Sequence, residues 1–232
     1  MTRHSRKGPR RERGQALVEF VIVLPILIFL ILGVVQFALL YQIKSVLNHA
    51  TFLAARNGAL DHGQKGGTGG ISQGFASGLS PLFNHGTSLA DLVTARLKAE
   101  RETLDPSITT ITIVSPTRQM VNDFGITRLD GKGGREIPND SLQYRATTPG
   151  ATSNVSIQDA NLLKVQTTYC ALLIVPIVDR AIYSMVNGMS NFWNPGNDTN
   201  GSRTRCAVAN GGAYRIPVTT TYLVRMQSSF QL

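Results

Sequence analysis

Residues that carry catalysis or bind metals are scarce in this chain, and the shortage limits the chemistry that it can perform. Of the 232 residues, four are His, two are Cys and one is Trp. No His follows His85, so neither cysteine has a histidine close by in sequence to act as a base. The sequence also lacks a Ser-His-Asp pattern and a cluster of His, Cys and carboxylates at metal-ligand spacing. We therefore expect no enzymatic activity, no catalytic residue, no metal and no cofactor.

Charge is absent from one long stretch near the N-terminus. No charged side chain lies between Glu19 and Lys44, which leaves the 24 residues from Phe20 to Ile43 without charge. As a helix rising about 1.5 Å per residue, they would span roughly 36 Å, enough to cross a hydrocarbon core of about 30 Å with some tilt. The apolar run is too long for a secretory signal peptide, and no A-x-A-like site follows it. We predict a single transmembrane helix.

A basic leader precedes this helix and sets its orientation. Six basic residues against Glu12 give residues 1–14 a net charge of +5, more than half of the chain's +9. Cationic residues beside a membrane span stay in the cytoplasm, so we predict a cytoplasmic N-terminus and an extracytoplasmic C-terminal domain. Because the high charge is largely this topology signal and no aromatic-interleaved basic patch occurs, we expect no nucleic-acid partner. The basic residues are Arg3, Arg6, Lys7, Arg10, Arg11 and Arg13.

Gly14, Glu19 and Phe20 stand together at the cytoplasmic edge of the predicted span. This G-x4-E-F arrangement resembles the processing site of type IV prepilins, in which a membrane aspartyl peptidase cuts after the glycine. By resemblance, the cut lies between Gly14 and Gln15, and Glu19 pairs with the new α-amino group of a neighbouring subunit. Taken alone, Glu19 favours the alternative of an interfacial carboxylate that is solvated at the headgroups, and its occurrence together with Gly14 and Phe20 lowers the weight of that alternative.

The resemblance extends along the whole N-terminal region. Residues 13–60 resemble the TadE-like family. Its members are minor pilin-like proteins of the tight-adherence (Tad, or Flp) pilus. Residues 161–178 and 225–228 support the resemblance more loosely. The matching residues are Arg13, Gly14, Ala16, Val18, Glu19, Phe20, Leu24, Pro25, Gly33, Phe37, Ala54, Ala55 and Arg56.

The resemblance implies a non-enzymatic minor pilin or pseudopilin that acts in pilus assembly, secretion and surface adherence. It places the protein in the bacterial inner membrane, with a periplasmic C-terminal domain, and allows a further place in the extracellular pilus. The implied partners are the prepilin peptidase, other Tad pilin-like proteins, the major pilin, the inner-membrane Tad platform and the membrane. The alternative function is a single-pass, membrane-anchored extracytoplasmic enzyme or ligand-binding domain.

The predicted helix continues beyond the membrane and covers residues 15–58. Pro25 lies inside it, where it either unwinds the helix locally and helps subunits pack during assembly, or produces a kink without a role. Past the span, apolar residues recur at steps of three and four and form one stripe that we expect to face the outer domain. Gly58 is the predicted end. The stripe comprises Ile43, Val46, Leu47, Ala50, Leu53 and Ala54.

The remainder divides into a linker and an outer domain. Residues 59–86 are rich in Gly and Ser and are predicted to be a linker, and the glycines at 66–70 lack the lysine and hydroxyl residue of a phosphate-binding loop. Residues 87–232 form the predicted extracytoplasmic α+β domain. It has a helix over 87–104, strands over 107–115, 162–175 and 213–227, weaker strands near 119–127 and 142–147, and a short helix over 179–193. The overall prediction is an α+β fold with an antiparallel β-sheet.

Cys170 and Cys206 are the only cysteines. An even pair in a domain outside the cytoplasm favours a disulfide. The alternative is that Cys170, which falls inside a predicted strand, is a buried free thiol.

Overall fold

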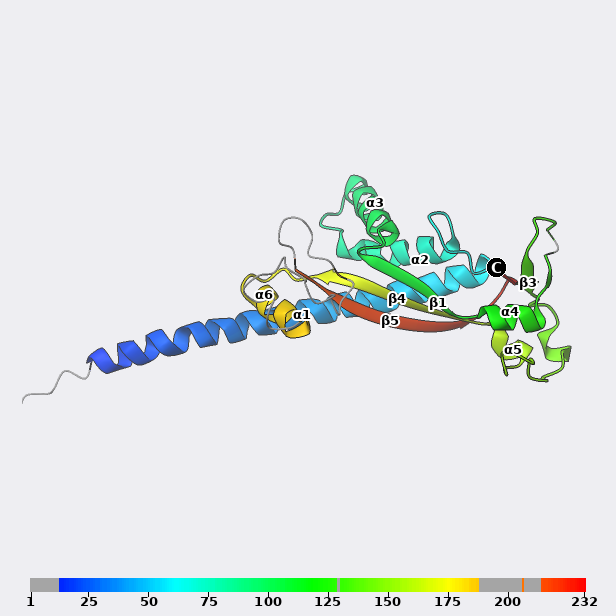
Figure 1. Cartoon of the computed structure of the whole chain (residues 1–232). Helices are drawn as coiled ribbons and strands as arrows, with labels where there is room; N and C mark the ends of the chain where they lie inside the picture. The colour runs from blue at the N-terminus through cyan, green and yellow to red at the C-terminus, as the bar shows by residue number, and fades with distance from the viewer. Residues whose placement is uncertain (1–12, 129, 188–205, 207–213) are drawn as a thin grey trace, which may run out of the picture.

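One helix organises the molecule. The computed structural model describes residues 13–128, 130–187, 206 and 214–232. Helix α1 (Arg13–Leu60) projects alone at its N-terminal end, and its C-terminal half packs against a domain of strands and shorter helices (Figure 1). The predicted α+β fold is confirmed. The helix is continuous through Pro25 and ends two residues beyond Gly58.

A three-stranded antiparallel sheet lies along the C-terminal half of α1. Strand β4 (Leu162–Leu172) is central, and β1 (Thr109–Ser115) and β5 (Arg215–Arg225) pair with its two edges. These are the three stretches whose β-branched and alternating residues predicted strong strands. A smaller sheet joins β2 (Ile126–Thr127), β3 (Arg135–Ile137) and β6 (Phe230–Gln231) at the end of the molecule farthest from the projecting helix (Figure 1).

The core forms between α1 and the sheet. Leu47, Ala50 and Ala54 of the predicted stripe are fully buried, together with Leu163 and Val165 of β4. At an apolar coefficient of about 25 cal/mol per Å², each buried leucine contributes roughly 2 kcal/mol, so this stripe is a major source of the domain's stability. The predicted packing of the outer half of the helix against the domain is confirmed.

Three buried threonines join the helix to two strands. The Thr51 hydroxyl lies 2.6 Å from that of Thr167 in β4, and it also bonds the hydroxyl of Thr220 in β5. Thr167 and Thr220 are 2.7 Å apart, and Thr51 donates to the Leu47 carbonyl oxygen at 2.8 Å. This cluster satisfies polar groups that would otherwise be costly to bury, and it fixes how α1 sits on the sheet.

The predicted linker differs from the structure. Residues 70–82 form helix α2 (Gly70–Leu79) and a short 3-10 helix, η1 (Ser80–Leu82), and α2 packs on α1. Gly70, Gly74 and Gly78 recur every four residues, and a Cβ at any of them would collide with the backbone of α1. The glycines therefore permit close helix packing rather than flexibility, and Ile71, Phe75 and Leu79, each one position further along, are fully buried.

Helix α3 (Leu89–Leu104) lies on α2 and is confirmed, with a capping box between Ser88 and Asp91 at its N-terminus. The predicted weak strands are wrong for most of their length. The first is largely helix α4 (Arg118–Phe124), capped by Thr117, and the second contains the 3-10 turn η2 (Leu142–Tyr144). In both segments, local capping and turn geometry favour helical turns over the predicted strands.

Two short helices complete the described chain. Helix α5 (Ile157–Ala160) precedes β4, and α6 (Val178–Asn187) follows it and lies beside α1 (Figure 1). Helix α6 confirms the first part of the helix predicted over 179–193. The remainder of that prediction lies outside the described residues.

Candidate functional site

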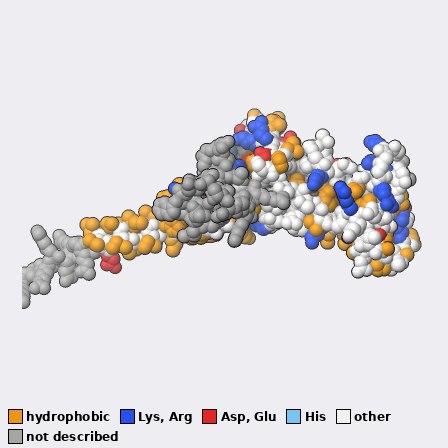
Figure 2. Space-filling model, in the orientation of Figure 1, with side chains coloured by type: hydrophobic (Ala, Val, Ile, Leu, Met, Phe, Trp, Pro, Cys, Tyr) orange, Lys and Arg blue, Asp and Glu red, His pale blue; other side chains and the backbone are white. Residues whose placement is uncertain are grey.

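The N-terminal half of α1 exposes large apolar side chains around its circumference. The 18-residue window that meets the length and composition of a membrane span has none of its residues buried inside the protein. Figure 2 shows this part of the helix as a rod covered by apolar side chains. Soluble monomers rarely expose a continuous apolar surface of this extent, so the rod needs a non-aqueous partner. Examples on successive turns are Leu17, Phe20, Ile22, Ile26, Leu30, Val34 and Phe37.

The predicted processing residues lie at the start of this rod. Because α1 begins at Arg13, Gly14 and Gln15 belong to its first turn, and Glu19 and Phe20 follow one turn later. Both Glu19 and Phe20 are exposed. Glu19 is the only acidic residue of α1, and within the described chain it makes no ion pair or hydrogen bond with another side chain. Its carboxylate is therefore available to an external partner.

A buried glutamine marks the point where the outer domain meets the rod. Gln36 is 0% exposed, although it lies within the charge-free run. Its side-chain oxygen accepts hydrogen bonds from the backbone N–H groups of Ile174, at 3.2 Å, and Val175, at 2.9 Å. These two residues belong to the connection between β4 and α6. The glutamine thus satisfies backbone groups of a non-helical segment that lies against the apolar helix.

A disulfide and an ion pair hold the strands and α3 together. Cys170 of β4 is bonded to Cys206, and both are buried. Glu102 of α3 accepts a hydrogen bond from the Tyr169 hydroxyl and pairs with Arg215 of β5 at 3.3 Å. Burial, and then the neighbouring Glu102 carboxylate, raise the pKa of Tyr169 far above its usual value, so this phenol stays protonated. The cluster ties α3 to β4 and β5.

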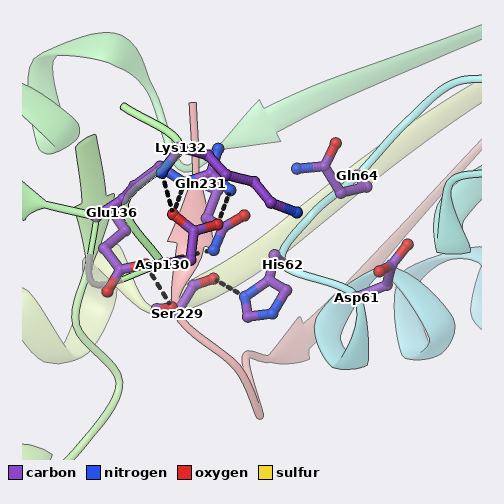
Figure 3. A pocket seen from close by; sticks show the side chains of 9 residues that line it. Asp61, His62, Gln64, Asp130, Lys132, Glu136, Ser229 and Gln231 are labelled. Atoms are coloured by element: carbon purple, nitrogen blue, oxygen red, sulfur yellow. Dashed lines mark hydrogen bonds and ion pairs between the residues drawn. The ribbon is translucent and has the colours of Figure 1, made fainter. Parts of the chain in front are cut away.

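A polar pocket lies at the end of the domain that is remote from the rod. It has a volume of about 660 Å³ and is lined by side chains of both charge signs. Figure 3 shows its labelled residues, which come from the turn after α1, from the connection between β2 and β3, from β3 itself and from the C-terminal segment. They include Asp61, His62, Gln64, Asp130, Lys132, Glu136, Ser229 and Gln231.

Hydrogen bonds within the pocket restrain the groups that could do chemistry. His62 Nδ1 lies 2.9 Å from the Ser229 carbonyl oxygen, so this ring nitrogen donates to the backbone. The Ser229 hydroxyl donates to Glu136 at 3.1 Å rather than to a histidine. No group of three metal-ligating side chains occurs among the described residues. The arrangement can bind a polar ligand, and among the described residues the Ser229 hydroxyl is bonded to a carboxylate and not to the His62 ring.

One further motif was missed in the sequence. Residues 70–74, GISQG, have the G-x-S-x-G spacing of hydrolase nucleophiles. In those enzymes the serine is exposed on a tight turn between a strand and a helix. Here Ser72 lies inside α2, is buried, and accepts a hydrogen bond from the Gly66 N–H at 3.2 Å. The glycines of this motif serve helix packing, so it does not mark a hydrolase site.

These features define a membrane-anchored protein in which one long helix is shared between an apolar anchor and an α+β domain. A comparison with protein families then shows which family part of the chain resembles. The family model described as TadE-like protein matches residues 14–56, and the predicted resemblance to this pilin-like, non-enzymatic family is confirmed over that stretch. The match covers most of α1 and stops before α2 and the sheet. No curated protein and no solved structure matches the chain.

Proposed function

We propose that this chain is a TadE-like minor pilin or pseudopilin that acts in the assembly of a Tad (Flp) pilus and in surface adherence. It carries out no catalysis of its own. A prepilin peptidase removes the basic leader by cutting between Gly14 and Gln15, and Phe20 completes the recognised motif. The mature chain starts at Gln15 and keeps the helix as its anchor in the bacterial inner membrane, with the α+β domain in the periplasm or on the pilus.

One observation carries this proposal. Gly14, Glu19 and Phe20 stand at the start of an exposed apolar helix, and the same helix is the central core element of the outer domain. A simple anchor needs neither the glycine nor an acidic residue at the edge of the span. A subunit that must be released from its leader and then paired with neighbours uses both.

Glu19 is the proposed assembly residue. A carboxylate at the edge of the hydrocarbon core is expensive unless a cation neutralises it. Cleavage creates such a cation, because it gives Gln15 a free α-amino group. Pairing of Glu19 with the amino group of a neighbouring subunit neutralises both charges and fixes the axial register of the two helices. Pro25, one to two turns further along, is the proposed point at which the helix adapts to its neighbours.

The proposed partners follow from this cycle. They are the prepilin peptidase, other Tad pilin-like proteins, the major pilin and the inner-membrane platform. The alternative, a membrane-anchored ligand-binding domain, rests on the polar pocket between the end of α1 and β3. It gives that pocket the functional role and leaves the helix as a plain anchor.

Complementation in bacteria that lack the native copy tests the proposal. Surface pili are counted by electron microscopy after expression of the native chain, Glu19→Gln or Glu100→Gln. Glu100 is a matched control because it lies on α3 in the outer domain and pairs only locally with Arg96. We expect pili with the native chain and the control and a strong loss with Glu19→Gln. Normal piliation by Glu19→Gln, or unchanged piliation without the protein, would refute the proposed role.

A further inference from the structure

Helix α6 and the connection that leads into it carry an apolar surface at the base of the outer domain. Ile174 is 62% exposed, Ile177 is 70% exposed and Met185 is 74% exposed, and Val186 is exposed as well. Within α6, Val178 and Tyr183 are buried. The connection and α6 therefore bury some apolar side chains in the domain and leave an apolar patch that no described residue covers.

Gln36 fixes the level of this patch along α1. The side chain bonds the N–H groups of Ile174 and Val175, and α6 contacts α1 directly. A hydrocarbon core of about 30 Å corresponds to roughly 20 helical residues, so a span that starts between Phe20 and Ile22 ends near residue 39 to 41. Gln36 then lies about 5–8 Å below the outer edge of the core. Ile174, at one end of the patch, is bonded to Gln36 and so lies at this level.

The chemistry of the connection suits this depth. Backbone that is not helical can lie at membrane level only if its N–H and C=O groups are satisfied or lie against protein. The Gln36 side chain does this for two consecutive N–H groups. Ile177 has φ 73°, a conformation that β-branched residues rarely adopt. The fold thus tolerates an unfavourable backbone where it leaves an isoleucine exposed.

We propose that the patch formed by Ile174, Ile177, Met185 and Val186 inserts into the outer leaflet of the membrane that α1 spans. Interfacial amphipathic helices bury their apolar face about 5–10 Å into the boundary between headgroups and acyl chains, which matches the level set by Gln36. Because Ile174 is bonded to Gln36 of α1 and α6 contacts α1, the patch and the exposed apolar surface of α1 meet the same bilayer. Helix α6 is then a second membrane contact that sets how the domain is held above the bilayer. This inference rests on the proposed membrane span of α1.

Depth-dependent quenching tests the proposal on the full chain. The protein is reconstituted into vesicles of phosphatidylethanolamine and phosphatidylglycerol that contain phospholipids with a doxyl quencher near the headgroup or deep in the acyl chain. An NBD probe is attached to Ile174→Cys or Met185→Cys, while the native cysteines stay in their disulfide. Val34→Cys, within the span, and Tyr144→Cys, 83% exposed on η2, serve as controls.

We expect the probes at 174 and 185 to be quenched by the shallow quencher several-fold more than the probe at 144, and the probe at 34 to be quenched by the deep one. Quenching at 34 together with none at 174 and 185 would overturn the proposal while leaving the span intact. Absence of quenching at all four positions would overturn the span and the proposal with it. NBD probes at 174 and 185 that are shielded from water at high protein density, but are quenched by neither lipid quencher, would overturn the proposal and assign the patch to contact with a second copy of the chain.

Replacement of the patch by charge gives an independent result. Ile177→Glu combined with Val186→Glu should abolish shallow quenching at position 174, because two carboxylates oppose insertion into the leaflet. The matched control, Leu223→Glu on β5, adds a carboxylate at another exposed apolar position, so it should leave the quenching unchanged. Undiminished quenching in the double variant would contradict the proposal.

Discussion

The two halves of α1 are both apolar, yet their side chains differ in size and surroundings. The N-terminal half presents Val, Leu, Ile and Phe on all sides, and these side chains are exposed. The C-terminal half places Ala50, Ala54, Ala55 and Ala59 against the domain, and all four are fully buried. Large side chains fill the space between a helix and lipid tails, whereas small ones let protein backbones approach closely. Side-chain size therefore separates the two partners of the helix where hydrophobicity alone does not.

Gly78→Leu should break the protein-facing half most severely. A Cβ at this position meets the Ala50 Cα, which belongs to the backbone and cannot rotate away. Overpacking of a well-packed site costs about 1–3 kcal/mol, and we expect a loss at or above the top of this range. Thermal unfolding of the full chain in detergent micelles, followed by near-ultraviolet circular dichroism, measures the effect.

Gly33→Leu is the matched control in the other half of the helix. A Cβ at Gly33 meets nothing within 4 Å, and the residue lies in the exposed half of α1. The variant should unfold at the temperature of the native protein. Equal destabilisation by the two variants would contradict the division of α1 into a lipid-facing half and a protein-facing half.

Gln36→Leu should loosen the junction between the halves. The variant leaves the buried N–H group of Val175 without its partner, and an unsatisfied buried donor costs about 1–3 kcal/mol. We expect faster hydrogen exchange at residues 174–178, measured by mass spectrometry, with β1 unchanged. Native exchange rates in this segment would show that Gln36 does not support it.

Thr51→Val should produce a smaller loss of about 1 kcal/mol, which is typical of one net hydrogen bond. The loss is limited because Thr167 and Thr220 remain bonded to each other. Thr168→Val is the control, since Thr168 bonds Thr219 on the exposed side of the same strand pair at 3.0 Å. Denaturant midpoints should fall for Thr51→Val and remain nearly constant for Thr168→Val. The opposite order would show that the buried cluster does not tie α1 to the sheet.

The smallest effect is expected at the Asp123 carboxyl of α4, and it should leave both halves of α1 intact. Hydrogen bonds from Ser153 and Thr152 lower the pKa of Asp123 to about 2. A depressed pKa means that the folded state favours the carboxylate. Its contribution is therefore present above the ordinary value of 3.8 and is lost as the pH falls towards 2. An NMR titration of the Asp123 carboxyl should give a midpoint near 2, and a midpoint at or above 3.8 would contradict the bonding.

The elements that could be predicted are those with a strong local pattern. The charge-free run predicted the apolar half of α1, the stripe through Leu47 and Ala54 predicted its packed half, and β-branched alternation predicted β1, β4 and β5. The strands β2, β3 and β6 have only two or three residues each, and β3 pairs both with the nearby β2 and with β6 at the distant C-terminal segment. Such pairing leaves no local signal.

Helix α2 shows how composition can mislead. Its glycines favoured a linker, but their spacing of four residues, in parallel with Ile71, Phe75 and Leu79, is the period of a helix face that packs closely on another helix. That period was the signal that could have revealed it. Gln36 also had a signal, because it is a polar residue within a charge-free apolar run. Its partners at 174 and 175 lie too far away in sequence to be inferred.

For the candidate site, too, some residues could be predicted from the sequence and others could not. Gly14, Glu19 and Phe20 were identified from their spacing and their position before the apolar run, and cleavage there stays a prediction. The distal pocket could not be predicted, because Asp61, Asp130 and Ser229 are brought together by the small sheet and by hydrogen bonds between the C-terminal segment and the turn after α1. A pocket that is built from three distant segments has no sequence motif.

The central claim is that α1 belongs to a processed pilin-like subunit, and the N-terminus of the mature chain tests it most directly. Intact-mass spectrometry of the protein from membranes that contain the prepilin peptidase should give a chain that begins at Gln15. The Gly14→Ala variant should retain its leader, and the Gly33→Ala control should be cut as the native chain is. A native chain that keeps residues 1–14 beside an active peptidase would contradict the account and leave α1 as an ordinary membrane anchor.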